Sequence, residues 1–350
     1  MCSMAMLCLY VLCNLCTAVI ASTLPPCLGQ YRYVPSDLES RWVSTVADYS
    51  SNHPAWAQGC KKERQDRPFL EQWLRYNEQL RNSSSSIQAN VNRQVLPDVI
   101  SYFTLAPNAT GAGCSAKTRY LPIEPLAVAL RHPHWPCQCR KPDHGGRCSK
   151  KVLFSTDWLV FVPPHLYTPV RRAYFFDLGS TYYDAGVAGE ADSLKQFVHK
   201  YRTLAEVEFD EIFAWEAKPI PHRSYWNRVD LDMVHKIHFF NSPTSANLTD
   251  PMSALRMIVA LVHPNDFVVF KLDIDNSAVE AEIILAILES PALIARIDEL
   301  FWEHHVQGSP TMWAGWGGPS NLKGRHSTLL SSYQLFTRLR QAGIRAHSWI

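Results

Sequence analysis

From residue 171 onward, short apolar runs alternate with segments of helical periodicity, and this alternation constrains the fold more than any other feature. In chain order, the runs are AYFFDLG, DEIFAWE, KIHFF, DFVVFKLDID, DELFWEHHV and IRAHSWI. Runs as apolar as FVVFKL are typical of strands that are covered on both faces, as in parallel sheets. Strands that alternate with helices predict an α/β fold with a doubly wound, mostly parallel, Rossmann-like sheet.

The segments between these strands carry helix signals. Residues 194–201 bring their apolar side chains onto one helical face. Asp250, which is followed by a proline, suits the N-cap and first turn of the next helix. Ser277 and Glu280 predict a capping box before AVEAEIILAILES, and Gly343 predicts the end of the amphipathic segment STLLSSYQLFTRLRQAG.

The first 150 residues have a different character. Prolines and turn-forming residues interrupt them, and serines fill positions 83–86. FLEQWLRYNEQL at 69–80 has apolar residues at helical spacing, and IEPLAVALRHP at 123–133 predicts a short helix that its last proline ends. We therefore expect a disulfide-pinned N-terminal region over residues 22–150, followed by an α/β domain over residues 151–350.

The chain opens with an apolar block, MAMLCLYVLCNLCTAVIAS. The block ends in small residues, and Val19-x-Ala21 fits the pattern before a signal cleavage site. This predicts a signal peptide over residues 1–21. An uncleaved anchor is the alternative, because the block is about as long as the shortest segment that spans a bilayer. Either way, the protein is expected to be secreted or to lie in the secretory-pathway lumen.

Cysteines and glycosylation triplets agree with that location. Six cysteines lie beyond the apolar block, and an oxidising compartment permits disulfides among them: Cys27, Cys60, Cys114, Cys137, Cys139 and Cys148. The last three, with nearby histidines, could instead bind zinc, but their spacing fits no defined zinc pattern. Acceptor triplets for N-linked glycan begin at Asn82, Asn108 and Asn247.

Charge excludes one class of partner. The formal net charge is +2, and the lysines and arginines form no concentrated basic stripe of the kind that binds a phosphate backbone. Nucleic acid is therefore not an expected partner, and no membrane contact is expected beyond the possible N-terminal anchor. The sequence specifies no oligomeric state.

The ends of the predicted strands are polar. In a doubly wound sheet the ligand lies beyond the carboxyl ends of the strands, so the residues that close each strand are the candidate site residues. In chain order these are Asp177 and Gly179, Glu216, Asn241, Asp273 and Asp275, and then Glu303, His304 and His305.

The series FFDLGS, FAWE, FKLDID and LFWEHH resembles the FkbM-type branch of the class I S-adenosylmethionine-dependent methyltransferases. The resemblance covers roughly residues 171–305 and does not reach the first 150 residues. It implies S-adenosylmethionine as the cofactor. By this resemblance Asp177 and Gly179 would border the cofactor, and Glu216 would accept hydrogen bonds from its ribose.

The chemistry of the residues agrees with these implied roles. A carboxylate can accept from both hydroxyls of a vicinal diol, and glycine lets the backbone approach a ligand closely. Ser180 and Thr181 would supply hydroxyl donors to the carboxylate of the cofactor, and Asn241 completes the expected cofactor-binding set. The expected activity is O-methylation of a hydroxyl on a small-molecule or glycan acceptor.

Methyl transfer to a hydroxyl also needs a group that takes the hydroxyl proton. The candidate catalytic residues are Asp273, His304 and His305, and the resemblance implies that Asp273 lies under the transferred methyl. Because neighbouring strand residues point to opposite faces, at most one of the two histidines is expected to serve the site.

Two other functions remain open from the sequence. Asp273-Ile274-Asp275 after an apolar strand is also typical of metal-dependent glycosyltransferases, in which such a pair holds a divalent ion against a nucleotide-sugar. The third hypothesis is a non-catalytic binding module on a degenerate methyltransferase fold.

Overall fold

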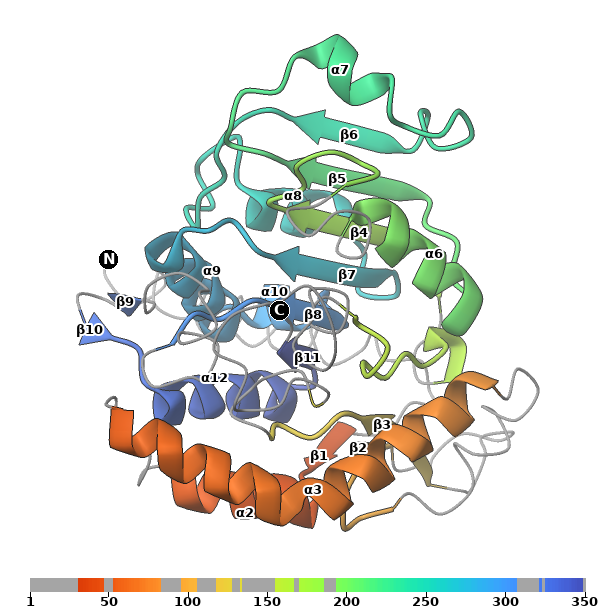
Figure 1. Ribbon diagram of the computed structural model, residues 1–350. Helices are drawn as coiled ribbons and strands as arrows, with labels where there is room; N and C mark the ends of the chain where they lie inside the picture. Colours follow the sequence, from red (N-terminus) through yellow and green to blue (C-terminus); the bar gives the residue numbers. More distant parts are fainter. Residues whose placement is uncertain are drawn as a thin grey trace, which may run out of the picture.

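A computed structural model gives the structure of the protein and describes residues 31–46, 53–82, 96–105, 118–127, 133, 155–166, 170–185, 193–306, 321–322 and 325–348. Its centre is a six-stranded sheet in which every neighbouring pair is parallel (Figure 1). The spatial order is β11 (Arg345–Ser348), β8 (Glu299–Trp302), β7 (Phe267–Leu272), β4 (Ala173–Leu178), β5 (Glu211–Trp215) and β6 (Ile237–Phe240). The predicted doubly wound α/β fold is confirmed.

Helices cover both faces of this sheet. In Figure 1, α6 lies in front of the sheet and α8 and α10 lie behind it. Phe197 of α6 packs against Phe175 of β4 and Phe301 of β8. On the opposite face, Trp302 of β8 packs against Phe336 of α12. The helices are α6 (Leu194–Leu204), α7 (His222–Trp226), α8 (Ala254–Leu261), α9 (Ser277–Glu289), α10 (Pro291–Ile294) and α12 (Leu329–Gln341).

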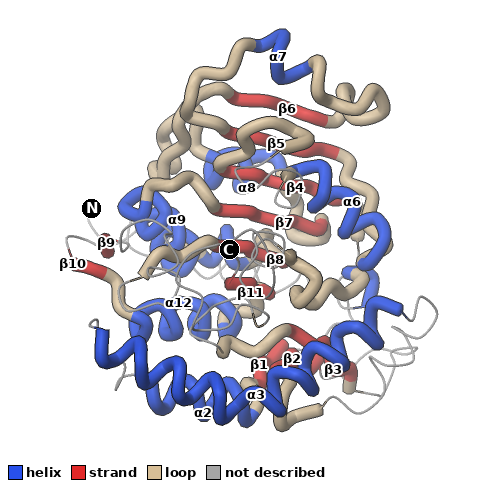
Figure 2. The backbone as a smooth tube through the Cα atoms, viewed as in Figure 1, coloured by secondary structure: helices blue, strands red, loops and turns tan. Residues whose placement is uncertain are grey.

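A second layer, built from the N-terminal part of the described chain, lies below the parallel sheet in Figure 2. It contains an antiparallel sheet in the order β1-β2-β3 and two helices. Its elements are β1 (Tyr31–Val34), α2 (Asp37–Val46), α3 (His53–Asn82), β2 (Ser101–Leu105) and β3 (Arg119–Ile123). Shorter elements elsewhere are η2 (Pro164–Leu166), β9 (Asn321–Leu322) and β10 (Arg325–His326).

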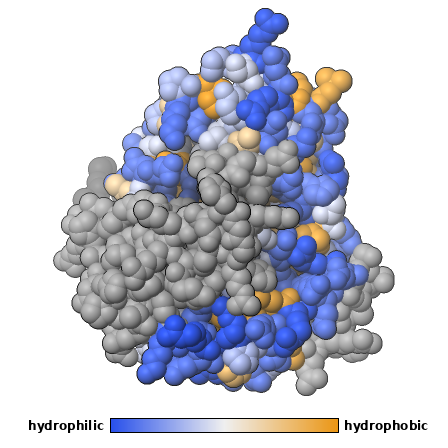
Figure 3. Space-filling view, viewed as in Figure 1, coloured by the Kyte–Doolittle hydropathy of each residue, from blue (hydrophilic) through white to orange (hydrophobic). Residues whose placement is uncertain are grey.

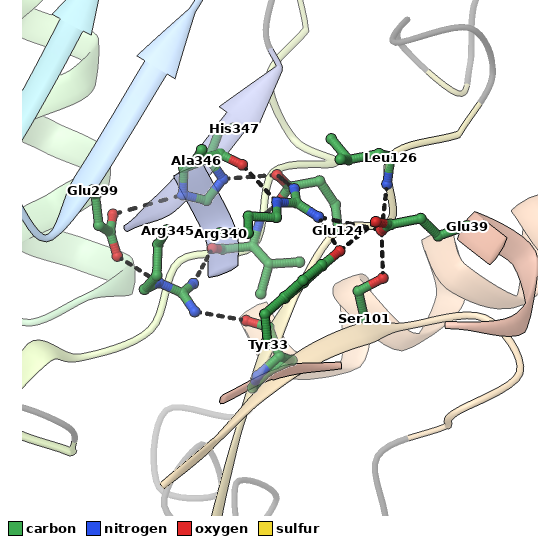
Figure 4. Close-up of polar contacts among 12 residues, drawn as sticks. Tyr33, Glu39, Ser101, Glu124, Leu126, Glu299, Arg340, Arg345, Ala346 and His347 are labelled. Carbon is green, nitrogen blue, oxygen red and sulfur yellow. Dashed lines mark hydrogen bonds and ion pairs between the residues drawn. The ribbon is translucent and has the colours of Figure 1, made fainter. Parts of the chain in front are cut away.

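Buried charges join the N-terminal layer to the parallel sheet (Figure 4). Arg340 of α12 is fully buried and pairs with Glu39 of α2 at 3.3 Å and with Glu124, which follows β3, at 3.4 Å. Its guanidinium also donates to the Tyr33 hydroxyl at 2.8 Å and to the Ala346 carbonyl at 2.9 Å. We call these residues, with those of the next paragraph, the buried charge network.

The second half of the network lies on β11. Arg345 pairs with Glu299 of β8 at 2.9 Å and donates to the Pro122 carbonyl of β3 at 3.1 Å. His347 Nδ1 lies 2.8 Å from Glu124, and its Nε2 lies 3.9 Å from Glu299. Two arginines and one histidine thus face three buried glutamates.

The structure confirms several predicted helices. The segment at 69–80 lies within α3, residues 194–201 lie within α6, and the segment before Gly343 forms α12. Gly343 has φ +98°, a left-handed conformation that favours glycine after a helix.

Three local predictions are wrong. Residues 123–133 do not form the predicted helix over their described part, because β3 extends to Ile123 and the next four residues are not helical. Asp250 is not the N-cap of α8: that residue is Ser253, whereas Asp250 accepts from the Met252 amide within its own turn. The N-cap of α9 is Asn276, so the predicted capping box does not form.

Several predictions lie wholly or partly outside the described residues. These are the signal peptide, Asn108 and the cysteines at 27, 114, 137, 139 and 148; Cys60 lies in α3, but its side chain is not described. Asn82, the last residue of α3, and Asn247 are both exposed. Among the described helices, none combines the length and the apolar character that crossing a membrane requires. The face in Figure 3 is mostly hydrophilic where its residues are described.

Candidate active site

The candidate site lies at the carboxyl edge of the parallel sheet, where β4, β5, β7 and β8 end. The chain builds β5 and β6 on one side of β4 and then β7, β8 and β11 on the other, so the strand order reverses between β4 and β7. In open α/β sheets, ligands bind outside the strand ends at such a reversal, and this order is also that of dinucleotide-binding Rossmann folds. The sheet therefore brings the polar ends of four strands to one edge, as predicted.

Gly179 closes β4 by close approach to the end of β7. It has φ +92°, and a Cβ at this position would lie 1.6 Å from the Asp273 carbonyl oxygen. The amides of Gly179 and Ser180 both donate to the Trp215 carbonyl at 2.9 Å. Glycine is thus required here by the neighbouring backbone, and these two amides are already used within the fold.

Glu216 follows β5 and lies over the turn after β4. One carboxylate oxygen accepts from the Thr181 amide at 3.2 Å and the other from the Lys218 amide at 2.6 Å. Glu216 as a whole is only 6% exposed. A carboxylate oxygen has two lone pairs, so each can accept one further hydrogen bond from a ligand.

Asn241, which follows β6, shapes the loop beyond Glu216. Its amide nitrogen donates to the carbonyls of Glu216 and Lys218, both at 2.7 Å, and its oxygen accepts from the Ile220 amide at 2.8 Å. These contacts give the side chain a structural role that the sequence did not suggest.

The hydroxyl groups after β4 differ in their partners. Thr181, in a left-handed conformation with φ +46°, donates its hydroxyl to the Ala185 carbonyl at 2.8 Å. Ser180 and Tyr225 of α7 are buried, and their hydroxyls interact with one another but have no other hydrogen-bond partner among the described residues. Burial, followed by the charge of Asp177, raises the pKa of Tyr225, so this hydroxyl stays protonated. Two buried hydroxyls with no partner beyond each other can still bond to a ligand or a water.

Lys271 joins the ends of β4 and β7. It lies opposite Asp177 in the parallel register, and both residues are buried inside otherwise apolar strands. Its Nζ lies 3.1 Å from Asp177 and 3.4 Å from Asp273. Lys271 therefore holds Asp273 toward the sheet, whereas Asp177 is a buried partner of this lysine.

A second group of polar side chains lies beside Asp273. Asp275, Glu303 and His305 have ligand atoms within 4.8 Å of one another. His305 Nε2 lies 3.3 Å from Glu303, and the two side chains are 9% and 12% exposed. Burial, followed by the charge of Asp273, raises the pKa of Glu303 to about 8.

Glu280 of α9 lies beneath this group. It accepts from the Ile274 amide and from the Trp302 indole nitrogen, both at 3.3 Å. Burial, followed by the charge of Asp273, raises its pKa to about 7. Glu280 was predicted to cap α9, but its contacts instead fix the turn that carries Asp273 and Asp275.

His304 does not join the group. Its ring stacks on Trp302 at a centroid distance of 3.7 Å, and its Nδ1 lies 2.7 Å from the Ser332 hydroxyl of α12. Burial, followed by the charge of His305, lowers its pKa well below the ordinary value. Of the two candidate histidines, only His305 lies among the acids at the carboxyl edge.

No protein-family model, no curated protein and no solved structure matches this chain. The resemblance to FkbM-type methyltransferases therefore stays a hypothesis drawn from four short motifs. Arguments about function depend on the chemistry of the site itself, because a fold of this type serves many activities.

Sequence reasoning missed three features of the site. These are the role of Lys271, the role of Glu280, and the pairing of Glu303 with His305. Two signals could have found Lys271 and the pairing of Glu303 with His305. A lysine inside the run FVVFKL has to pair with an acid, and Asp177 occupies the matching position of the run AYFFDL. Strand alternation also groups Glu303 with His305 and separates both from Trp302 and His304.

Proposed function

We propose that the protein is an S-adenosylmethionine-dependent O-methyltransferase that acts on a hydroxyl of a small metabolite or glycan in the secretory pathway. The observation that carries this proposal is the position of Glu216 against the turn after β4, beside the point where the strand order reverses. A nearly buried carboxylate at the end of the second strand suits the two ribose hydroxyls of an adenosyl group.

The residues fit the cofactor in part. Glu216 has lone pairs left for the ribose hydroxyls, and the hydroxyls of Ser180 and Tyr225 have no partner beyond each other among the described residues. Gly179 and Thr181 fit less well than the sequence suggested, since their polar groups are used within the fold. The binding groups we assign are therefore Glu216 and Ser180.

S-adenosylmethionine would supply a methyl group on a positively charged sulfur. The chain's own task is then to orient the acceptor hydroxyl and to remove its proton. Asp273 suits this task, because Lys271 holds it at the strand end, where it keeps partial exposure. His304 is excluded by its burial against Trp302.

Calorimetric titration of the full chain tests the proposal. The ligands are S-adenosylmethionine, S-adenosylhomocysteine, a dinucleotide such as NAD, and a set of nucleotide-sugars with manganese. We expect binding of the first two only. Binding of NAD alone, or of a nucleotide-sugar alone, would replace the methyltransferase assignment.

Two substitutions sharpen this test. Glu216→Gln should weaken S-adenosylmethionine binding at least about tenfold, because an amide nitrogen then meets a ribose hydroxyl or a backbone N–H. Glu211→Gln is the matched control, since Glu211 lies at the opposite end of β5. Asp273→Asn should leave binding of the cofactor unchanged. Equal affinity in Glu216→Gln and the wild type would return Glu216 to a purely structural role.

The glycosyltransferase alternative is weaker in this structure. Asp275 belongs to the group of possible metal ligands, but Asp273 does not, and Asp273 pairs with Lys271 instead. The two aspartates of Asp-x-Asp thus face different partners, whereas that alternative needs them to act on one ion.

A further inference from the structure

We propose that Asp275, Glu303 and His305 bind a divalent metal ion of the kind that accepts both carboxylate and imidazole ligands, such as Mn²⁺. The three residues come from two neighbouring loops, one after β7 and one after β8. We call them the metal triad. The proposal is independent of the cofactor and concerns a different set of residues from the Asp-x-Asp pair.

The distances suit one shared ion. All three ligand atoms lie within 4.8 Å of one another, and His305 Nε2 lies 3.3 Å from Glu303. Two ligands that each lie about 2.2 Å from one ion are at most about 4.4 Å apart. The three atoms are therefore spread about as widely as ligands around one ion, and the exposed Asp275 can move to complete the site.

Two of the ligands are held in position before any ion binds. Glu303 and His305 directly follow β8, and the Glu303 amide donates to the Leu272 carbonyl of β7 at 3.3 Å. Asp273 lies next to Glu303 and is itself held by Lys271. Such outer contacts orient metal ligands and strengthen binding. Asp275, whose side chain is 63% exposed, leaves the triad open to an ion from solvent.

Further acidic side chains lie around the triad. Asp177, Asp273, Asp275, Glu280 and Glu303 gather at this edge. The cations that pair with them among the described residues are Lys271 and, at 3.9 Å from Asp275, Lys218. An ion held by the triad would lie among these side chains.

The ion would also have a role if the proposed function holds. It would lie beside Asp273, where it could hold the oxygen of the acceptor hydroxyl and favour loss of its proton. His305 would then serve as a ligand, and the proton would pass to Asp273. This role depends on the proposed methyltransferase activity, but binding of the ion does not.

Electron paramagnetic resonance of Mn²⁺ titrated into the metal-free full chain tests the proposal. We expect one ion bound per chain. His305→Gln and Asp275→Asn should each weaken binding at least about tenfold, on the scale of losses seen at metal sites. Asp275 is exposed, so Asp275→Asn keeps the test valid even if a buried substitution unfolds the protein. His199→Gln and Asp232→Asn, which change exposed residues elsewhere, are the controls.

Absence of stoichiometric Mn²⁺ binding, or equal affinity in Asp275→Asn and the wild type, would overturn the proposal. Calorimetry with S-adenosylmethionine on the same samples separates it from the proposed function. Mn²⁺ binding without cofactor binding would sustain the metal triad and remove the methyltransferase assignment. Cofactor binding without Mn²⁺ binding would remove the metal triad and sustain the methyltransferase assignment.

Discussion

Replacing Arg340 by methionine should destabilise the protein more than any surface substitution of the same kind. Methionine keeps the length of the side chain and removes its charge and its donors. In the buried charge network this leaves three glutamates against Arg345 and His347, so one buried negative charge loses its partner. Breaking a buried pair in this way typically costs about 3–5 kcal/mol of unfolding free energy.

Thermal and urea unfolding, followed by circular dichroism, measure this cost. At about 2–4 °C per kcal/mol for a large domain, the expected loss lowers Tm by about 6–20 °C. Arg202→Met is the matched control, because Arg202 forms an ion pair with Glu208 and the side chains are 44% and 57% exposed. Exposed pairs contribute about 0–1 kcal/mol.

Equal losses in the two variants would refute the reasoning, since the network would then contribute no more than a surface pair. A loss below about 1 kcal/mol for Arg340→Met would have the same consequence. Limited proteolysis adds a spatial readout. Cleavage in the Arg340→Met protein should begin in residues 31–127, because these lose their connection to α12 first.

Three further predictions concern pH, backbone and processing. Burial raises the pKa of Glu124, but His347 and Arg340 outweigh burial and hold this pKa below 4.5. The ionised Glu124 therefore stabilises the fold above that pH, and this stabilisation is lost as pH falls. In urea unfolding between pH 3 and 6, the unfolding free energy of Glu124→Gln should fall less steeply toward low pH than that of the wild type. Gly179→Ala should cost at least about 3 kcal/mol through strain and a backbone clash, whereas Gly343→Ala, with nothing within 4 Å of its Cβ, should cost only about 1–2 kcal/mol. Similar Tm losses in both would contradict the clash argument. Intact-mass measurement before and after glycosidase should show a chain without its apolar leader and with glycan at one of the exposed asparagines; an unmodified full-length chain would remove the secretory location.

The parallel sheet could be predicted because each of its strands carries its own signal. AYFFDL and FVVFKL are buried along their whole length, and in the sequence each is an apolar run with a single charged residue. Helix positions followed from periodicity, but helix starts did not. Ser253 and Asn276 are the N-caps in place of the predicted Asp250 and Ser277, and the exact end of a helix is the part that sequence defines least well.

The N-terminal layer could not be predicted in the same way. Tyr31 of β1 pairs with Leu105 of β2, and no local pattern signals a partner so far along the chain. The helix expected at 123–133 failed for a related reason. Ile123 pairs with Ser101, and Glu124 turns into the buried charge network instead of facing solvent on a helix.

The sequence predicted which residues lie at the site, because they follow the strand ends. The polar residues that close β4, β5, β7 and β8 do meet at one edge, since parallel strands bring their carboxyl ends together. Their individual partners depend on side-chain geometry that sequence does not contain. Glu216 binds two amides, Asn241 braces a loop, and His304 turns into the core.

The buried charge network sets a time at which the chain can finish folding. Glu124 is separated from Arg340 by 216 residues, and Glu39 by 301. At about 5–20 residues per second, a ribosome needs about 10–45 s to travel from Glu124 to Arg340. Until then the two acids have no arginine to pair with, so the N-terminal layer should stay solvated and sensitive to protease in chains stalled before Arg340. The first part of the protein to be made would thus be among the last to close, which gives folding factors a long interval in which to reach it.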